Sequence, residues 1–232
     1  MRHGGVRGRC MRARNLGECY LTAREALLRL GFAGELDWQE SRRLSDLSES
    51  EFLRQAAWVI LTCGFRESIV REIFPEISHA FLDWTRARSI ARRRPYCELQ
   101  AAKVFNHPGK IRAIGALCER VAREGFQNVR KKIESTGLEF LQTFNFIGPV
   151  TSYHLAKNIG LDVVKPDRHL LRISRAAGFS SPAELCRTIS DMIGDSVAVI
   201  DIVLWRYATL TPNYTRLFSN PRFSTSPADQ TA

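Results

Sequence analysis

Apolar residues recur every three or four positions along most of the chain, which is the period of an α-helix. Residues 51–64 carry apolar side chains on one helical face, and this predicts a core helix with Phe52, Ala56, Val59, Ile60 and Cys63 facing inward. The same period predicts helices over residues 69–84, 111–124, 129–135, 138–144 and 197–208. No stretch alternates with period two and β-branched enrichment, as strands do. We therefore expect an all-α fold.

Glycine, serine and proline mark the expected ends of these helices. Gly125 and Gly137 follow apolar helical stretches and are expected stops. Ser180-Ser181-Pro182 predicts the N-cap and first turn of a helix that begins near Ala183. Serine, threonine, proline and asparagine dominate after Pro212, so we expect residues 221–232 to form a disordered tail.

Charge and cysteine usage narrow the class of protein. The formal net charge of +10 indicates a polyanionic partner, of which nucleic acid is the commonest, although a membrane surface or an acidic protein would also be attracted. The six cysteines are scattered, with no spacing typical of metal ligands, so neither a disulfide scaffold nor a metal centre is expected. No apolar run reaches the roughly 20 residues that span a bilayer, and we expect a cytoplasmic protein, nucleoid-associated if bacterial, with no membrane partner.

Residues 144–160 contain two apolar helical stretches joined by a tight turn. Backbone N–H groups at the start of the second helix point outward, where the helix dipole favours an anion such as phosphate. We expect DNA contacts from the turn, the hydroxyls of the first helical turn and one lysine: Ile147, Gly148, Pro149, Val150, Thr151, Ser152 and Lys157. An ordinary corner between two helices, with a glycine stop, is the alternative.

The segment resembles the helix-hairpin-helix of the DNA glycosylase superfamily that includes endonuclease III. The hairpin of that family reads Leu-Pro-Gly-Val-Gly-x-Lys-Thr-Ala, and residues 144–152 here read Phe-Asn-Phe-Ile-Gly-Pro-Val-Thr-Ser. Lys165-Pro-Asp-Arg-His-Leu-Leu-Arg172 is similar to the family's Val-Asp-Thr-His-x-x-Arg and follows at the family's spacing. The resemblance places Asp167 at the position of the catalytic aspartate.

Two branches of the superfamily share further local features with this chain. Residues 148–154, Asp167-Arg168-His169, and Asp201 with Trp205 are similar to motifs of the archaeal type of 8-oxoguanine glycosylase. The Phe-x-Phe-Ile-Gly turn, Tyr153 and residues 107–112 resemble bacterial 3-methyladenine DNA glycosylase I. The resemblance covers about residues 50–210, and its specific part is confined to residues 144–173.

The resemblance implies a fold and a reaction. The fold would be a two-lobed, all-α glycosylase architecture with the active-site cleft between the lobes: residues 1–50 and 174–220 would form a terminal helical lobe, and residues 51–173 a helical barrel lobe. The enzyme would flip a base out of the duplex, and Asp167 would stabilise the oxocarbenium-like transition state and orient water while the N-glycosidic bond is hydrolysed. Asp167 also has the sequence context of a helix N-cap, and the two roles are compatible.

One departure from the family changes the expected chemistry. Val150 stands where strand-nicking members have the lysine that forms a Schiff base, so we expect hydrolysis without AP-lyase activity. Lys165 lies close to Asp167 in sequence and is the alternative nucleophile. No cofactor is required for the chemistry, and a monovalent cation at the hairpin is implied by the family.

The remaining expected site residues fall into two groups. Base-pocket residues are Phe65, Tyr153, His154, Asp201 and Trp205, with core packing as the alternative; further DNA contacts are Lys165, Arg168, His169 and Arg172. Residues 86–110 hold seven basic residues against one acidic, and we expect them to follow the phosphate backbone.

The expected partner is double-stranded DNA that contains a damaged or modified base, bound by a monomer. Alkylated purine, oxidised guanine, a mismatched base and a hypermodified phage base all stay open, so the role is base excision repair or antiphage defence. The competing hypothesis is a non-catalytic repair or phage-defence accessory protein that uses the hairpin as a phosphate clamp. A helix-turn-helix transcription factor is disfavoured because the second helix lacks polar base-reading residues. The lack of clustered metal ligands disfavours a deaminase or a metallonuclease.

Overall fold

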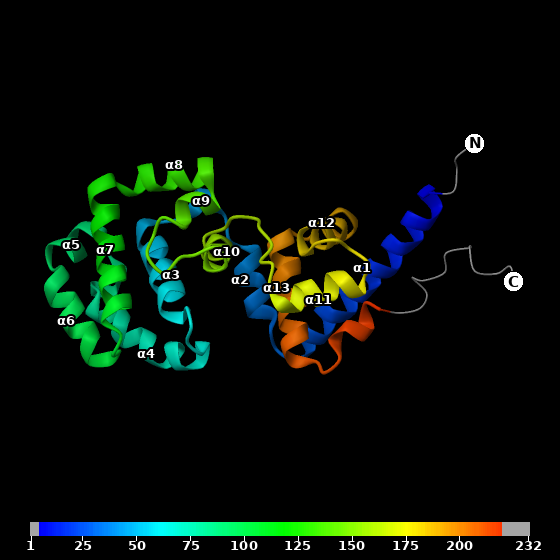
Figure 1. Cartoon of the computed structure of the whole chain (residues 1–232), viewed down its shortest axis with the longest axis horizontal. Helices are drawn as coiled ribbons and strands as arrows, with labels where there is room; N and C mark the ends of the chain where they lie inside the picture. The colour runs from blue at the N-terminus through cyan, green and yellow to red at the C-terminus, as the bar shows by residue number, and fades with distance from the viewer. Residues whose placement is uncertain (1–4, 220–232) are drawn as a thin grey trace, which may run out of the picture. The chain divides into compact units, whose positions relative to one another are not determined.

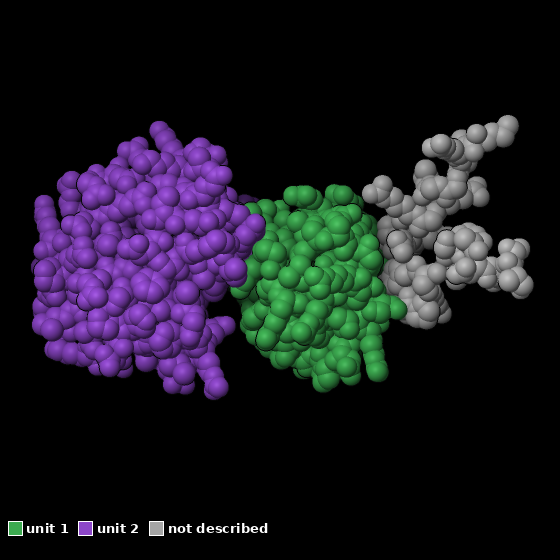
Figure 2. All heavy atoms as spheres, viewed as in Figure 1, with its two compact units in different colours: residues 1–41, 162–232 green, residues 42–161 purple. Residues whose placement is uncertain are grey.

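The computed structural model describes residues 5–219, with side chains from Leu16 onward, and every regular element in that part is a helix (Figure 1). The all-α prediction is therefore confirmed. The chain divides into two compact units (Figure 2). We call residues 42–161 the central unit and residues 1–41 with 162–232 the terminal unit. The expected disordered tail, residues 221–232, lies outside the described residues.

The central unit is built around one buried helix, α3 (Glu49–Thr62), which packs against α4, α7 and α10. Ser48 caps its start by accepting a hydrogen bond from Glu51 N. Phe52, Ala56, Val59 and Ile60 are buried as predicted, whereas Cys63, at the C-cap, is only half-buried. The other elements are η1 (Leu44–Asp46), α4 (Glu67–Ala80), η2 (Leu82–Trp84), α5 (Ala87–Arg92), α6 (Arg94–Val104), α7 (Pro108–Glu124), α8 (Phe126–Thr136), α9 (Leu138–Leu141) and α10 (Thr151–Asn158).

The terminal unit is built around α13 (Val197–Leu210), which contacts α1, α2, α11 and α12. The apolar side chains of α13 lie in a core cluster with residues of α1, α11 and α12. Ser181 caps α12 by accepting from Glu184 N, which confirms the predicted start of that helix. The other elements are α1 (Gly5–Arg29), α2 (Ala33–Glu40), α11 (Arg168–Ala176), α12 (Pro182–Ile193) and η3 (Tyr214–Leu217).

The unit boundaries differ from the expected lobe boundaries after residues 50 and 173, and lie after residues 41 and 161. The physical reason at the second boundary is packing: Leu170 and Ile173 of α11 are buried in the core of the terminal unit. Residues 162–173 therefore belong with the terminal helices. The hairpin lies in the central unit and Asp167 in the terminal unit.

Three predicted helices end earlier than expected, and the one predicted over residues 51–64 ends at Thr62. The helix predicted over residues 69–84 breaks after Ala80, because Leu82, Asp83 and Trp84 all have positive φ. The helix predicted over residues 138–144 ends at Leu141. A tight turn follows, in which Phe144 N donates to Leu141 O at 3.2 Å. The predicted stops at Gly125 and Gly137 are confirmed, because both adopt positive φ.

A buried lysine closes the C-terminal end of α3. Lys110 of α7 is 2% exposed, and its Nζ donates to the carbonyl oxygens of Ile60, Leu61 (2.9 Å) and Cys63 (2.5 Å). These are carbonyls that the helix cannot satisfy from within. Burial lowers the pKa of the Lys110 ammonium below its ordinary value.

We predict that Lys110→Met lowers the free energy of unfolding by about 3 kcal/mol, because three carbonyls lose a charged donor at once. Lys103→Met is the control, since Lys103 is exposed and bonds only at the surface to Gln100, and it should change stability by less than about 0.5 kcal/mol. Urea denaturation of both variants measures the difference. Equal stabilities would show that the end of α3 does not depend on the ammonium.

Candidate functional site

The hairpin turn is closed by its own backbone. Ile147 N donates to Phe144 O at 3.1 Å, and the Ile147 side chain is buried in the unit. Phe146 has φ +65°, a left-handed conformation that costs a non-glycine residue about 1–2 kcal/mol. The family motif has glycine at this position. This chain places a phenyl ring, 39% exposed, at that position of the turn.

The hydroxyl groups expected to bind phosphate bond instead within the turn. Thr151 Oγ1 accepts from Gly148 N at 2.8 Å and donates to Phe146 O at 3.2 Å. Ser152 is fully buried, and its Oγ donates to Pro149 O at 3.1 Å. The backbone N–H groups of Val150 and Thr151 lie in the first turn of α10, where a helix offers no acceptor. The anion-binding capacity of the hairpin therefore resides in the backbone.

The expected base-pocket residues divide between the two units. Phe65, Tyr153 and His154 belong to the central unit, and Asp201 and Trp205 to α13 of the terminal unit. Tyr153, His154 and Trp205 are half-buried, and Phe65 is 40% exposed. Asp201 is 1% exposed and accepts a hydrogen bond from Lys165 N at 2.5 Å, so its carboxylate is directed at the backbone. Lys157, expected to contact phosphate, is also buried.

Aromatic side chains gather around the Lys110 ammonium. The nitrogen lies 5.0 Å from the ring centre of Phe65 and 5.5 Å from that of Phe146. His107 lies edge to face with both rings, at 5.9 Å between ring centres in each case, and it stacks on Phe105. The loop after α3 and the hairpin turn thereby share one aromatic surface. Phe65 was predicted as a site residue from the sequence, and Phe146 was not. A bulky residue where the similar glycosylase motif has glycine could have indicated Phe146.

Asp167 is the N-cap of α11. Its Oδ1 accepts from His169 N at 2.8 Å and from Leu170 N at 3.0 Å. Of the described groups, the backbone of residues 5–219 and the side chains from Leu16 onward, none donates to Oδ2. One carboxylate oxygen is therefore fixed by the helix, and the other is available to a reactant. The N-cap and catalytic interpretations are compatible in this geometry.

The side chains that follow Asp167 include a pair the sequence did not predict. Arg168 Nε donates to His169 Nε2 at 3.3 Å, and His169 Nδ1 lies 3.0 Å from Tyr214 Oη. A guanidinium can only donate, so Nε2 is the acceptor and Nδ1 carries the proton toward Tyr214. Arg168 and Arg172 are exposed on α11, as a phosphate contact requires.

Five of the seven basic residues between 86 and 110 are exposed: Arg86, Arg88, Arg92, Arg93 and Lys103. The other two have internal roles. Arg94 bonds Glu98 at 2.7 Å and Glu119 at 2.5 Å, and Lys110 is buried. The five exposed residues are placed as the predicted phosphate contacts require. Arg94 and Lys110 are not, because their side chains are engaged within the protein.

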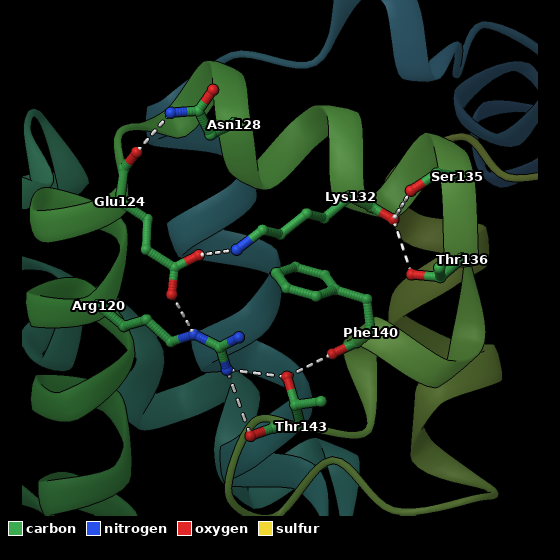
Figure 3. A network of polar contacts seen from close by, with 8 residues as sticks. All are labelled: Arg120, Glu124, Asn128, Lys132, Ser135, Thr136, Phe140 and Thr143. Carbon is green, nitrogen blue, oxygen red and sulfur yellow. Dashed lines mark hydrogen bonds and ion pairs between the residues drawn. The ribbon is translucent and has the colours of Figure 1, made fainter.

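A polar network attaches the segment before the hairpin to α7 and α8 (Figure 3). Arg120 donates to Glu124 at 2.7 Å and to Thr143 Oγ1 at 2.8 Å, and Lys132 donates to the other oxygen of Glu124 at 2.8 Å. The Arg120 guanidinium lies 4.6 Å from the ring centre of Phe144 and 5.0 Å from that of Phe140. The turn that leads into the hairpin is thus held at both its side chains and its backbone.

The described residues offer few groups that could bind a metal ion. No three His, Cys, Asp or Glu side chains from that part of the chain lie together as metal ligands. The carbonyls of Phe146 and Gly148 in the hairpin already accept hydrogen bonds from Thr151 Oγ1 and Ser152 N. A carbonyl has a second lone pair, so a monovalent cation at the hairpin stays a prediction. No described helix is long and apolar enough to span a bilayer.

We predict that Glu124→Gln lowers the free energy of unfolding by about 1 kcal/mol at neutral pH, because it breaks a charged network. Hydrogen bonds from Lys132 and Arg120 hold the pKa of Glu124 below its ordinary value. The stabilisation is therefore present above the unfolded pKa and is lost as pH falls through the lower folded pKa. Urea denaturation at neutral and acidic pH should show the gap to wild type closing in acid. Glu134→Gln, at an exposed pair, should leave stability nearly unchanged.

Comparison with known proteins gives no relative: no family model, curated protein or solved structure matches the chain. Its function is therefore inferred from its own residues. The central unit holds a hairpin with an aromatic surface. The terminal unit holds the Asp167 carboxylate, of which only Oδ1 accepts capping hydrogen bonds, and exposed arginines on α11.

Proposed function

We propose that the chain is a monofunctional DNA glycosylase, acting on a damaged or modified base in duplex DNA. The proposal rests mainly on the position and the hydrogen bonding of Asp167. It follows the hairpin at the family's spacing, and one of its oxygens is held by α11 while the other has no donor among the described residues. The hairpin belongs to the central unit and Asp167 to the terminal unit.

The proposed reaction is hydrolysis of the bond between C1′ of the sugar and the base nitrogen. As that bond breaks, the base leaves with the electron pair and positive charge builds on the sugar. The Asp167 carboxylate stabilises this charge, and Oδ2 takes a proton from the attacking water while the water oxygen bonds to C1′. The departing base takes up a proton from solvent, Asp167 releases its proton to solvent, and an abasic site remains. Flipping the nucleotide out of the stack exposes the bond, at a cost that is smallest for a poorly paired base.

The absence of a lyase step in this proposal rests on Val150. Its side chain is 55% exposed at the start of α10, so the position of the family's lysine is accessible but carries no nucleophile. Lys165 remains the alternative nucleophile. Its backbone N–H is committed to Asp201.

Double-stranded DNA is the proposed partner, bound by a cytoplasmic monomer. The exposed arginines of α5 and α11 offer charge to the phosphates, and the ring surface at Phe65 and Phe146 offers stacking to exposed bases. A non-catalytic DNA-binding accessory protein is the second candidate, because the aromatic surface and the basic helices do not need Asp167.

Catalysis is tested with Asp167→Asn, because asparagine keeps an oxygen that caps α11 and loses the charge. Duplexes that each contain one alkylated purine, oxidised guanine, mismatched base or hypermodified phage base are incubated with both proteins, and abasic sites are cleaved with alkali. On at least one duplex we expect base release by the wild type to exceed that of the variant by about 100-fold or more. Binding of that duplex should be nearly equal for the two proteins.

Two outcomes separate the candidates. Equal binding without base release from any duplex favours the accessory protein. Borohydride treatment of the active mixture should trap no covalent protein–DNA adduct, and a trapped adduct that Lys165→Met removes would assign the lyase step to that lysine.

We also predict that Arg172→Gln reduces the salt dependence of DNA binding. One lost phosphate contact lowers the slope of log affinity against log salt by about 0.9. Arg29→Gln is the control, because Arg29 is also exposed but lies at the end of α1 and pairs with Glu25. Fluorescence anisotropy over a salt series measures both slopes. An unchanged slope for Arg172→Gln would remove α11 from the DNA interface.

A further inference from the structure

A carboxylate lies buried in the core of the terminal unit, where an apolar side chain would be expected. Asp201 is 1% exposed, and its neighbours on α13 include the fully buried Ile200, Val203 and Leu204. A buried charge is costly unless hydrogen bonds compensate it. Asp201 Oδ2 accepts from Lys165 N at 2.5 Å, a hydrogen bond from a backbone donor to an ionisable acceptor.

The same residue, Lys165, is bonded to Asp167. Asp167 N donates to Lys165 O at 2.8 Å, which closes a three-residue turn around Pro166. Proline fixes its own φ, so the turn has little freedom. The position of the Asp167 backbone is therefore set by the position of the Lys165 peptide groups.

A second carboxylate anchors the start of this segment. Asp162 Oδ1 accepts from Ala198 N at 2.9 Å, at the first turn of α13. Val164 is buried in the same core as α13. The segment from Asp162 to Asp167 is thus attached to α13 at two places. Asp162 bonds Ala198 N, and Lys165 N bonds Asp201.

We propose that Asp201 is a positioning residue for Asp167, acting through the Lys165 backbone. This inference rests on the proposed function, in which Asp167 meets the sugar. It replaces the expected base-contacting role of Asp201, because a fully buried oxygen engaged by a backbone N–H is not presented to a base. Reaction rates depend steeply on such placement, since an error of about 1 Å can cost about 100-fold.

Three variants of α13 separate positioning from mere stability. Asp201→Asn keeps an oxygen acceptor for Lys165 N, whereas Asp201→Leu removes it. Val203→Ala weakens the same core and leaves the hydrogen bond intact. On a duplex that the wild type cleaves, we expect the single-turnover rate of Asp201→Leu to fall by about 100-fold while its DNA affinity changes little. The rates of Asp201→Asn and Val203→Ala should stay close to that of wild type. A comparable loss in Val203→Ala would overturn the proposal.

Amide hydrogen exchange gives a readout that needs no activity. In the wild-type protein the amides of Lys165 and Asp167 should exchange slowly compared with Arg168, which lies in the first turn of α11 where a helix offers no acceptor. Asp201→Leu should release both amides, while Asp201→Asn and Val203→Ala should not. Fast exchange of Lys165 and Asp167 in wild type would overturn the positioning role. Slow exchange in a protein that cleaves no duplex would instead reject the glycosylase proposal and leave the anchored segment in place.

Discussion

The C-terminal end of α3 imposes the constraint on which the central unit depends. Carbonyl groups there have no partner within the helix, and α7 supplies the donor through the Lys110 ammonium. Besides these carbonyls, the rings of Phe65 and Phe146 stabilise the ammonium charge, because they present their negative faces to it. One ammonium therefore joins the core helix, the loop that follows it and the hairpin turn.

The terminal unit uses the opposite charge for the equivalent task. Asp167, Asp162 and Asp201 each direct a carboxylate oxygen at a backbone N–H, two of them at the first turn of a helix. Negative charge is stabilised at a helix N-terminus and positive charge at a C-terminus by the aligned peptide dipoles. The charged groups that shape the candidate site are thus matched to backbone groups of the opposite polarity in both units.

Periodicity predicted the helices well, because a buried helical face leaves a regular pattern: Phe52, Ala56, Val59 and Ile60 are all buried. Local capping chemistry was equally legible at Ser181 and Gly125. Two of the failures involve partners distant in sequence. Lys110 was counted among exposed basic residues, although its acceptors lie some fifty positions earlier, and Asp201 was assigned to a pocket, although it bonds Lys165. The pattern of Leu170 and Ile173 marks a buried face but does not say which core receives it.

The hairpin differs from the glycosylase motif that it resembles, and under the proposed function this difference would shift DNA binding to other helices. Phe146 and Val150 stand where that motif has glycine and lysine, and both side chains are exposed, apolar and uncharged. Thr151 Oγ1 is engaged by Gly148 N, which leaves the N–H groups of the first turn of α10 as the groups that face an anion. If the chain binds DNA as proposed, affinity for the polyanion would come mainly from arginines on other helices, such as α5 and α11. The aromatic turn would then contact bases, where charge contributes little and stacking contributes most.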